Sequence, residues 1–288
     1  MTPIAARPSR SVRLMYSLSA AALLAAVSLA STAHAGIVPV SAAQCAQMKA
    51  RKVITPANPV PCSRLATVSF DYTDFDGAVR NGSVVVLDAV APQVESLFGE
   101  LLLRSVPIAG AQPLEHFDGD DEKSMAANNT SAFNGRPMTG GGGWSKHAYG
   151  AAIDINPLQN PYVTKAGTAQ QEVLPPASAA QYVQRAPVQA GMAEDVVGAF
   201  YDHGFLIWGG NWKQPIDYQH FEIGSREFIR KLATLPKPEA RAEFERYVAR
   251  YRSCAHKNEE AHAPAADSDD DAPEDTSLRD SCAARLRR

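Results

Sequence analysis

The sequence predicts an α+β fold in which a small antiparallel sheet is flanked by helices. Three observations predict it: short segments in which polar and apolar residues alternate, segments with apolar residues at helical spacing, and glycine-containing turns that separate the two kinds. Apolar residues make up 45% of the 288 residues, which is enough for one sizeable core.

The elements follow in order along the chain. Residues 65–72 alternate and residues 83–87 are a β-branched run, so both are predicted to be strands, with turns at Gly77 and at Asn81-Gly82. Residues 89–105 have apolar residues at helical spacing and are expected to pack on the sheet. Further strands are predicted at residues 151–156, 205–208 and 217–223.

Two more helices and two irregular segments complete the prediction. Residues 193–203 are expected to form a helix that Gly204 ends, and residues 225–254 a helical segment interrupted at Pro236 and Pro238. The polar, glycine-rich residues 116–143 are predicted to be a long loop, and residues 158–191 an insertion. Long ordered loops in compact domains tend to be functional, although plain disorder is an open alternative for the glycines at 140–143.

The first 35 residues have the pattern of a secretory signal peptide. Arg7, Arg10 and Arg13 precede an apolar run at residues 18–30, and the small residues of Ala33-His34-Ala35 suit a cleavage site. A retained membrane anchor is the alternative, but the run is short for a bilayer. The sequence therefore predicts export to the periplasm or the outside of the cell, with no membrane span after cleavage.

The rest of the chain divides into three parts. Residues 36–64 are expected to be an N-terminal arm without regular structure, residues 65–254 a single domain, and residues 255–288 an acidic, disordered tail. The four cysteines fall into two separated pairs, Cys45 with Cys62 and Cys254 with Cys282, for which two local disulfides are favoured. A structural zinc site is the rival interpretation, but no Cys-x-x-Cys spacing supports it.

Charge and patterning exclude some partners. The formal net charge is −3 and the basic residues are scattered, so no nucleic acid is expected as a partner. No heptad pattern is present, and the oligomeric state stays open. Four histidines without acidic neighbours at ligand spacing are predicted to lie on the surface: His116, His203, His256 and His262.

Two segments carry residues suited to metal chemistry. In the first, His147 and Asp154 flank the glycine turn at Gly150, a weak signal on spacing alone. The second adds His220, with Asp217 three residues earlier. Two neutral imidazoles and one carboxylate give zinc three protein ligands and leave a fourth position for water, the composition of a catalytic site.

Asp217 is the candidate base that takes a proton from water activated by the zinc. An ideal strand places residues 217 and 220 on opposite faces, so the interpretation requires a bend or bulge between them. The alternative is that Asp217 is a solvated turn residue after Pro215.

These motifs resemble those of the D-alanyl-D-alanine carboxypeptidase-like zinc metallopeptidases, which belong to a superfamily that also contains lysostaphin-type enzymes and the hedgehog signalling domain. The resemblance extends over about residues 65–223, upstream through residues 129–136 and downstream through residues 156–162. It is carried by the pattern Ser145-x-His147-x-x-Gly150-x-Ala152-x-Asp154 and by the later Asp217-x-x-His220.

The resemblance implies a fold, a reaction and a set of roles. It implies that the domain is a hedgehog-like, D-Ala-D-Ala peptidase-like zinc peptidase, with His147, Asp154 and His220 as zinc ligands and Asp217 as general base. The aspartate at position 217 is similar to that of L-alanyl-D-glutamate peptidases and phage endolysins, whereas the carboxypeptidases usually have glutamate. The expected substrate is therefore the peptidoglycan stem peptide, with the bond left open between D,D- and L,D-type and between carboxypeptidase and endopeptidase.

Other residues of the motif region have supporting roles by the same resemblance. Arg136 matches the arginine that holds the substrate or polarises its carbonyl, with a surface arginine as the alternative. Ser145 is expected to brace the site by hydrogen bonding. Tyr149, Trp208 and Trp212 are candidates for lining a substrate groove, with simple packing as the alternative.

Two other functions stay open at this point. One is a non-catalytic zinc module that binds wall fragments or a protein, which does not require Asp217. The other is a peptidase with protein substrates, which rests on shared chemistry alone.

Overall fold

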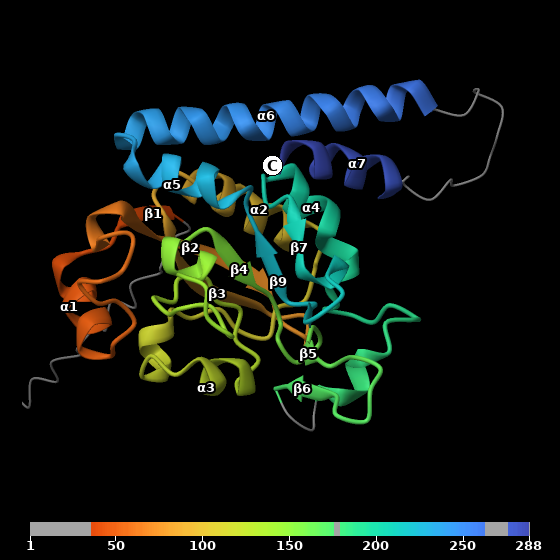
Figure 1. Ribbon diagram of the computed structural model, residues 1–288, viewed down its shortest axis with the longest axis horizontal. Coiled ribbons are helices and arrows are strands. Elements are labelled where there is room, and N and C mark those ends of the chain that lie inside the picture. Colours follow the sequence, from red (N-terminus) through yellow and green to blue (C-terminus); the bar gives the residue numbers. More distant parts are fainter. Residues whose placement is uncertain (1–35, 176–178, 263–275, 288) are drawn as a thin grey trace, which may run out of the picture. The chain divides into compact units, whose positions relative to one another are not determined.

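The computed structural model describes residues 36–175, 179–262 and 276–287, and within them three small antiparallel sheets are combined with helices (Figure 1). Their strand orders are β1-β2-β3, β4-β9-β7 and β6-β5-β8. The predicted α+β class is confirmed, with three small sheets where the sequence predicted one. The predicted signal peptide at residues 1–35 lies outside the described residues.

The first sheet consists of β1 (Gly36–Pro39), β2 (Leu65–Thr73) and β3 (Val79–Leu87). The turn predicted at Asn81-Gly82 is wrong, because both residues lie inside β3. The turn predicted at Gly77 is confirmed: the chain reverses at residues 74–77, where the Asp74 carboxylate accepts hydrogen bonds from the backbone of Asp76 and Ala78. Gly82 is required for packing, since a Cβ there would lie 2.8 Å from Cβ of Ala111.

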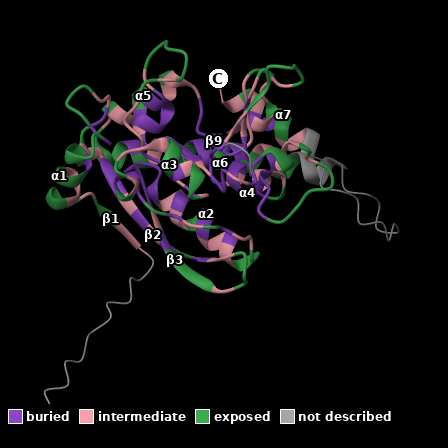
Figure 2. Ribbon diagram, turned by 90° about the horizontal axis from the view of Figure 1, so that it is seen from below, coloured by how far each residue is buried: buried purple, intermediate pink, exposed green. Residues whose placement is uncertain are grey.

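Helix α2 (Ala91–Leu103) covers one face of this sheet. Its buried side chains repeat at helical spacing, as predicted, and the ring of Phe98 stacks on that of Phe70 in β2 at a centroid distance of 3.6 Å. Buried residues concentrate at this contact and through the centre of the domain (Figure 2). The helix therefore anchors the sheet from which the site is built.

The N-terminal arm is regular, contrary to the prediction. Residues 36–39 form an edge strand on β2, and α1 (Ala42–Ala50) follows, with Ser41 accepting a hydrogen bond from Gln44 as its N-cap. The disulfide between Cys45 and Cys62 confirms the local pairing. Backbone hydrogen bonding to an open strand edge, which composition does not report, orders this segment.

The second and third sheets are made of very short strands. β4 (Ala152–Asp154) pairs with β9 (His220–Glu222), which pairs with β7 (Ile207–Trp208). β5 (Tyr162–Thr164) pairs with β6 (Glu172–Leu174) and with β8 (Ile216–Asp217), so the predicted insertion supplies two strands. The strand predicted at residues 217–223 is divided between two sheets.

Two short helices precede strands of the second sheet along the chain, one before β4 and the other before β7. The predicted loop at residues 116–143 contains α3 (Asp121–Ala126), which is capped by the Asp120 carboxylate. α4 (Val197–Asp202) follows a 3-10 turn at Ala193–Val196, and Gly204 ends it at a φ of +87°, as predicted.

The prediction of a surface position is wrong for His203, which is 4% exposed. Its ring nitrogens lie 2.8 Å from the Ala199 carbonyl oxygen and 3.0 Å from the Ser96 hydroxyl. Burial lowers the pKa of His203 below its ordinary value, which favours the neutral imidazole. His116 and His256 are exposed, as predicted, and the side chain of His262 lies outside the described residues.

Three helices form the C-terminal part: α5 (Arg226–Thr234), α6 (Lys237–His262) and α7 (Thr276–Leu286). The predicted break falls at Pro236, whereas Pro238 lies in the first turn of α6, where proline is tolerated. In Figure 1 the long α6 runs beside α5 and α7.

The expectation of disorder beyond residue 254 is wrong for the rest of α6 and for α7. The disulfide between Cys254 and Cys282 confirms the second local pair and joins the two helices. Cys282 and Ala283 are buried in the core. Residues 263–275, which carry most of the acidic stretch, lie outside the described residues.

The described residues form one compact unit around one hydrophobic core. Along the part of the chain that the structure describes, no helix has the length and apolar character needed to cross a bilayer.

Candidate metal centre

His147 is positioned by a short turn that ends at Gly150. The 3-10 helix Lys146–Tyr149 begins at Ser145, whose hydroxyl accepts a hydrogen bond from the His147 backbone N–H at 3.3 Å. Gly150 has a φ of +67°, and a Cβ there would lie 2.4 Å from the backbone nitrogen of Leu87. Glycine therefore allows the turn to press on β3, which holds the imidazole in place.

Asp154 and His220 are brought together by strand pairing. They are directly opposite each other in the antiparallel pair β4–β9. Oδ1 of Asp154 lies 2.9 Å from Nδ1 of His220, and Oδ2 lies 3.2 Å from Nε2 of His147. The two imidazole nitrogens are 3.0 Å apart. Three donor atoms from distant parts of the chain therefore meet at one point, as the sequence predicted.

The hydrogen bonds of the imidazoles decide which nitrogens face this point. Nδ1 of His147 lies 2.6 Å from the Ala132 carbonyl oxygen, which can only accept, so Nδ1 carries the hydrogen. Nε2 of His220 lies 3.0 Å from Oε2 of Glu222 and donates to it. In the neutral rings the other nitrogens, Nε2 of His147 and Nδ1 of His220, then present lone pairs to each other and to the Asp154 carboxylate.

Three converging lone pairs repel one another unless a proton or a metal cation lies between them. Zinc bonds of about 2.0–2.2 Å in a tetrahedral site place ligand atoms roughly 3.3–3.6 Å apart. The observed separations of 2.9–3.2 Å are within a few tenths of an ångström of that spacing. These residues fit a divalent metal, and three protein ligands leave a position for water or substrate.

The electrostatics of the donors are coupled. Burial disfavours the charged form of Asp154, but the charge of His147 and hydrogen bonds from both imidazoles outweigh it, so the pKa of Asp154 lies far below its usual range. For His220, hydrogen bonds to Asp154 and Glu222 outweigh burial and raise the pKa to about 10. A metal ion must therefore displace a proton from His220 to bind.

Asp217 lies where β8 ends, and the bend at residues 218–219 separates it from β9. The bend that the sequence required is therefore present. Oδ1 of Asp217 is buried with no hydrogen-bond partner among the described residues. Burial raises the pKa of Asp217 to about 7, with a lowering effect from His220 and a raising effect from Asp154. The carboxyl group thus lies in the electrostatic field of the metal donors, and its pKa is near neutral pH.

Arg136 is held by an acid in this structure. Its Nε donates to Oδ2 of Asp121 in α3 at 2.9 Å, and its side chain is 35% exposed. Tyr162, which the sequence did not single out, is opposite Asp217 in the β5–β8 pair. Burial and the charge of Asp217 raise its pKa, whereas the charge of Arg136 lowers it.

The aromatic candidates divide between two faces. The Trp212 ring lies 5.3 Å from the His220 ring, beside the metal donors. Trp208 stacks on Phe221, and adjacent residues of a strand point to opposite faces, so Trp208 lies on the side of the sheet away from His220. Tyr149 is partly buried against the core.

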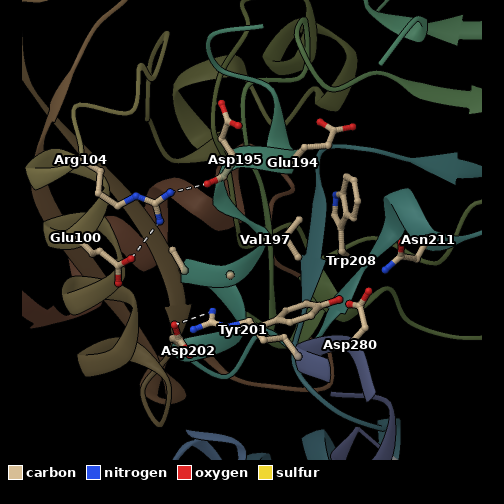
Figure 3. Close-up of a pocket in the computed structure, with 13 residues that line it drawn as sticks. Glu100, Arg104, Glu194, Asp195, Val197, Tyr201, Asp202, Trp208, Asn211 and Asp280 are labelled. Carbon is tan, nitrogen blue, oxygen red and sulfur yellow. Dashed lines mark hydrogen bonds and ion pairs between the residues drawn. The ribbon is translucent and has the colours of Figure 1, made fainter. Parts of the chain in front are cut away.

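Trp208 instead lines a cavity of about 660 Å³ bordered by α2, α4 and α7 (Figure 3). Figure 3 shows Arg104 bound to Glu100 and to the backbone of Asp195 in its wall. None of the three metal donors lines this cavity. It is therefore separate from the candidate metal centre.

Two more residues at the site were missed by sequence reasoning. Lys146 and Glu222, both buried, form an ion pair next to His220, and Lys146 also donates to the Gly224 carbonyl oxygen at 3.1 Å. The signal available in the sequence was a lysine directly before one histidine and a glutamate two residues after another.

The fold and the donor set define an α+β domain with a candidate metal site of two histidines and one aspartate. Residues 139–223 match the family described as D-alanyl-D-alanine carboxypeptidase. The match contains the three donors and Asp217, begins after Arg136, and confirms the resemblance to these metal-dependent peptidases. No curated protein and no solved structure matches the chain.

Proposed function

We propose that this protein is an exported zinc peptidase that hydrolyses peptide bonds in peptidoglycan stem peptides, as a D,D- or L,D-type carboxypeptidase or endopeptidase. The observation that carries the proposal is the convergence of His147, Asp154 and His220 within 4.8 Å beside the unpaired, buried carboxyl oxygen of Asp217. A site that only stabilises the fold needs no such carboxyl group.

The proposed roles follow from the positions of the side chains. His147, Asp154 and His220 would hold zinc, which, when bound, supplies a Lewis acid that acidifies water and polarises a carbonyl group. Asp217 accepts the proton of the attacking water and passes it to the leaving amine. A pKa of about 7 suits a group that both takes up and releases a proton near neutral pH.

Arg136 and the aromatic residues are assigned to substrate binding. The guanidinium of Arg136, once it leaves Asp121, would bind a carboxylate or carbonyl oxygen of the stem peptide. Trp212 lies beside His220 and would form one wall of the binding site, and Ser145 braces His147.

The compartment and the domain limits belong to the same proposal. Two disulfides suit an oxidising compartment outside the cytoplasm, in agreement with the signal-like residues 1–35. We assign the peptidase domain to residues 65–254, with residues 36–64 as an arm that extends its first sheet.

The test is digestion of purified muropeptides by the chain that begins at residue 36, followed by mass spectrometry of the products. We expect cleavage that a chelator abolishes and added zinc restores. The mass of the product identifies the bond and distinguishes a terminal from an internal cut. Zinc binding and tight wall binding without product from any muropeptide would contradict the proposal and favour a non-catalytic module. Cleavage of unrelated proteins alone would favour a general peptidase.

A further inference from the structure

The buried ion pair between Lys146 and Glu222 connects the two segments that carry the histidine donors. Lys146 directly precedes His147 in the 3-10 helix, and Glu222 follows His220 by two residues on the same face of β9. The side chains of Lys146 and Glu222 are 10% and 9% exposed. Moving two opposite charges out of water costs free energy. A buried pair at this position therefore needs an explanation that an ordinary surface ion pair does not.

The two oxygens of Glu222 have different partners. Oε2 lies 3.0 Å from Nε2 of His220, and Oε1 binds Nζ of Lys146. Nζ also donates to the Gly224 carbonyl oxygen, just beyond the end of β9. Lysine, glutamate and histidine therefore form one chain of hydrogen bonds that ends on a metal donor.

This chain selects one tautomer of His220. An ionised carboxylate can only accept hydrogen bonds, so Nε2 must carry the hydrogen and Nδ1 must present its lone pair. Because Nζ of Lys146 donates to Oε1 of Glu222, the other oxygen, Oε2, is the acceptor that faces Nε2 of His220. Nδ1 of His220 is then the ring nitrogen that faces Asp154 and His147.

We propose that Lys146 and Glu222 are positioning residues that fix the metal-binding tautomer of His220 and hold its strand against the segment of His147. Outer partners of this kind typically change metal affinity by about 10–100-fold. The inference rests on the metal site of the proposed function but not on its peptidase reaction.

The experiment measures zinc affinity by competition with a chromophoric chelator near neutral pH, together with nitrogen NMR of the histidine rings in the zinc-loaded protein. We expect Glu222→Gln and Lys146→Met each to raise the dissociation constant for zinc about 10–100-fold. The double variant should lose less than the product of the two single losses, because the residues act through one hydrogen-bond chain.

The matched control is Asp88→Asn, which breaks the ion pair of Arg64 with Asp88 at a similar side-chain exposure of 13% and 9%. It should lower the thermal midpoint and leave the zinc dissociation constant within about twofold, since the Asp88 carboxylate pairs with Arg64 and Lys237.

Two results would overturn the inference. One is a folded Glu222→Gln protein with the zinc affinity of the wild type. The other is zinc-loaded wild-type protein in which Nδ1 of His220 still carries a hydrogen, and this measurement does not depend on the folding of any variant. Wild-type protein that binds no zinc would overturn this inference together with the proposed function. Zinc binding that weakens in the variants as expected, without cleavage of any muropeptide, would support the positioning pair and contradict only the peptidase reaction.

Discussion

Asp154 and His220 are directly opposite each other on β4 and β9, with Oδ1 of Asp154 2.9 Å from Nδ1 of His220. Antiparallel pairing thus fixes two of the three metal donors across one strand pair, and the turn before Gly150 adds His147. The geometry of the site depends on backbone pairing, so single side chains can be changed without moving the others.

Replacing a donor should abolish metal binding while the fold persists. For Asp154→Ala we expect zinc affinity to fall by more than the roughly 100-fold that an outer partner controls. Elemental analysis after dialysis measures the bound zinc. Asp76→Asn, at an exposed turn, is the control and should bind zinc as the wild type does. Stoichiometric zinc in the Asp154→Ala protein would contradict the assignment.

Replacing the candidate base should separate metal binding from turnover. For Asp217→Asn we expect full zinc content and a loss in kcat of about 10²–10⁴-fold, because proton transfer loses its acceptor. Steady-state kinetics on a purified muropeptide tests this. Asp195→Asn, an exposed acid in the 3-10 turn before α4, should keep the wild-type rate. An active, zinc-loaded Asp217→Asn enzyme would remove Asp217 from the mechanism.

Asp217 should also give the metal-free protein a characteristic pH dependence. Burial raises its folded-state pKa from 3.8 to about 7, so the native state holds this proton more tightly than the unfolded chain does. The contribution of Asp217 to the free energy of unfolding should therefore fall as pH rises through that range, by at most about 1.4 kcal/mol per pH unit. Urea unfolding of wild-type and Asp217→Asn proteins at several pH values measures the difference. A difference that does not vary with pH would show that the carboxyl group is not protonated in the fold.

Arg136 should affect the use of substrate and leave the metal in place. We expect Arg136→Ala to lower kcat/KM by about 10–100-fold with zinc content unchanged, since it removes a charge that binds substrate. Asp121→Asn breaks the ion pair that holds Arg136 and should not lower kcat/KM. Equal activity of Arg136→Ala and wild type would leave Arg136 as a structural partner of α3.

The second disulfide should stabilise the protein without affecting the metal. Cys254 and Cys282 close a loop with a sequence separation of 28, and their joint replacement by serine should reduce the free energy of unfolding by about 2–4 kcal/mol. Denaturant unfolding and zinc analysis of the double variant test this together. Loss of zinc at full stability would indicate that α7 acts on the site.

The predictions that succeeded rest on local chemistry. The helix at α2 and the glycine that ends α4 each leave a pattern that short-range rules detect. The errors share a cause: Asn81-Gly82 has the composition of a turn but lies in β3, and residues 36–39 look irregular but pair with β2. In both cases a strand edge elsewhere in the chain overrode the local preference.

By itself the sequence determined which side chains can hold a metal and that one acid lies three residues before the second histidine, and it favoured local pairing of the cysteines. Only the tertiary structure decided that Glu222 and Lys146 complete the surroundings of His220, that Trp208 faces away from the metal donors, and that residues 276–286 pack on the core. The physical reason is that ligand identity is a property of single residues. The tautomer of a histidine, the face of a sheet on which a side chain lies and the burial of a helix depend on contacts between residues far apart in the chain. No local pattern encodes these contacts.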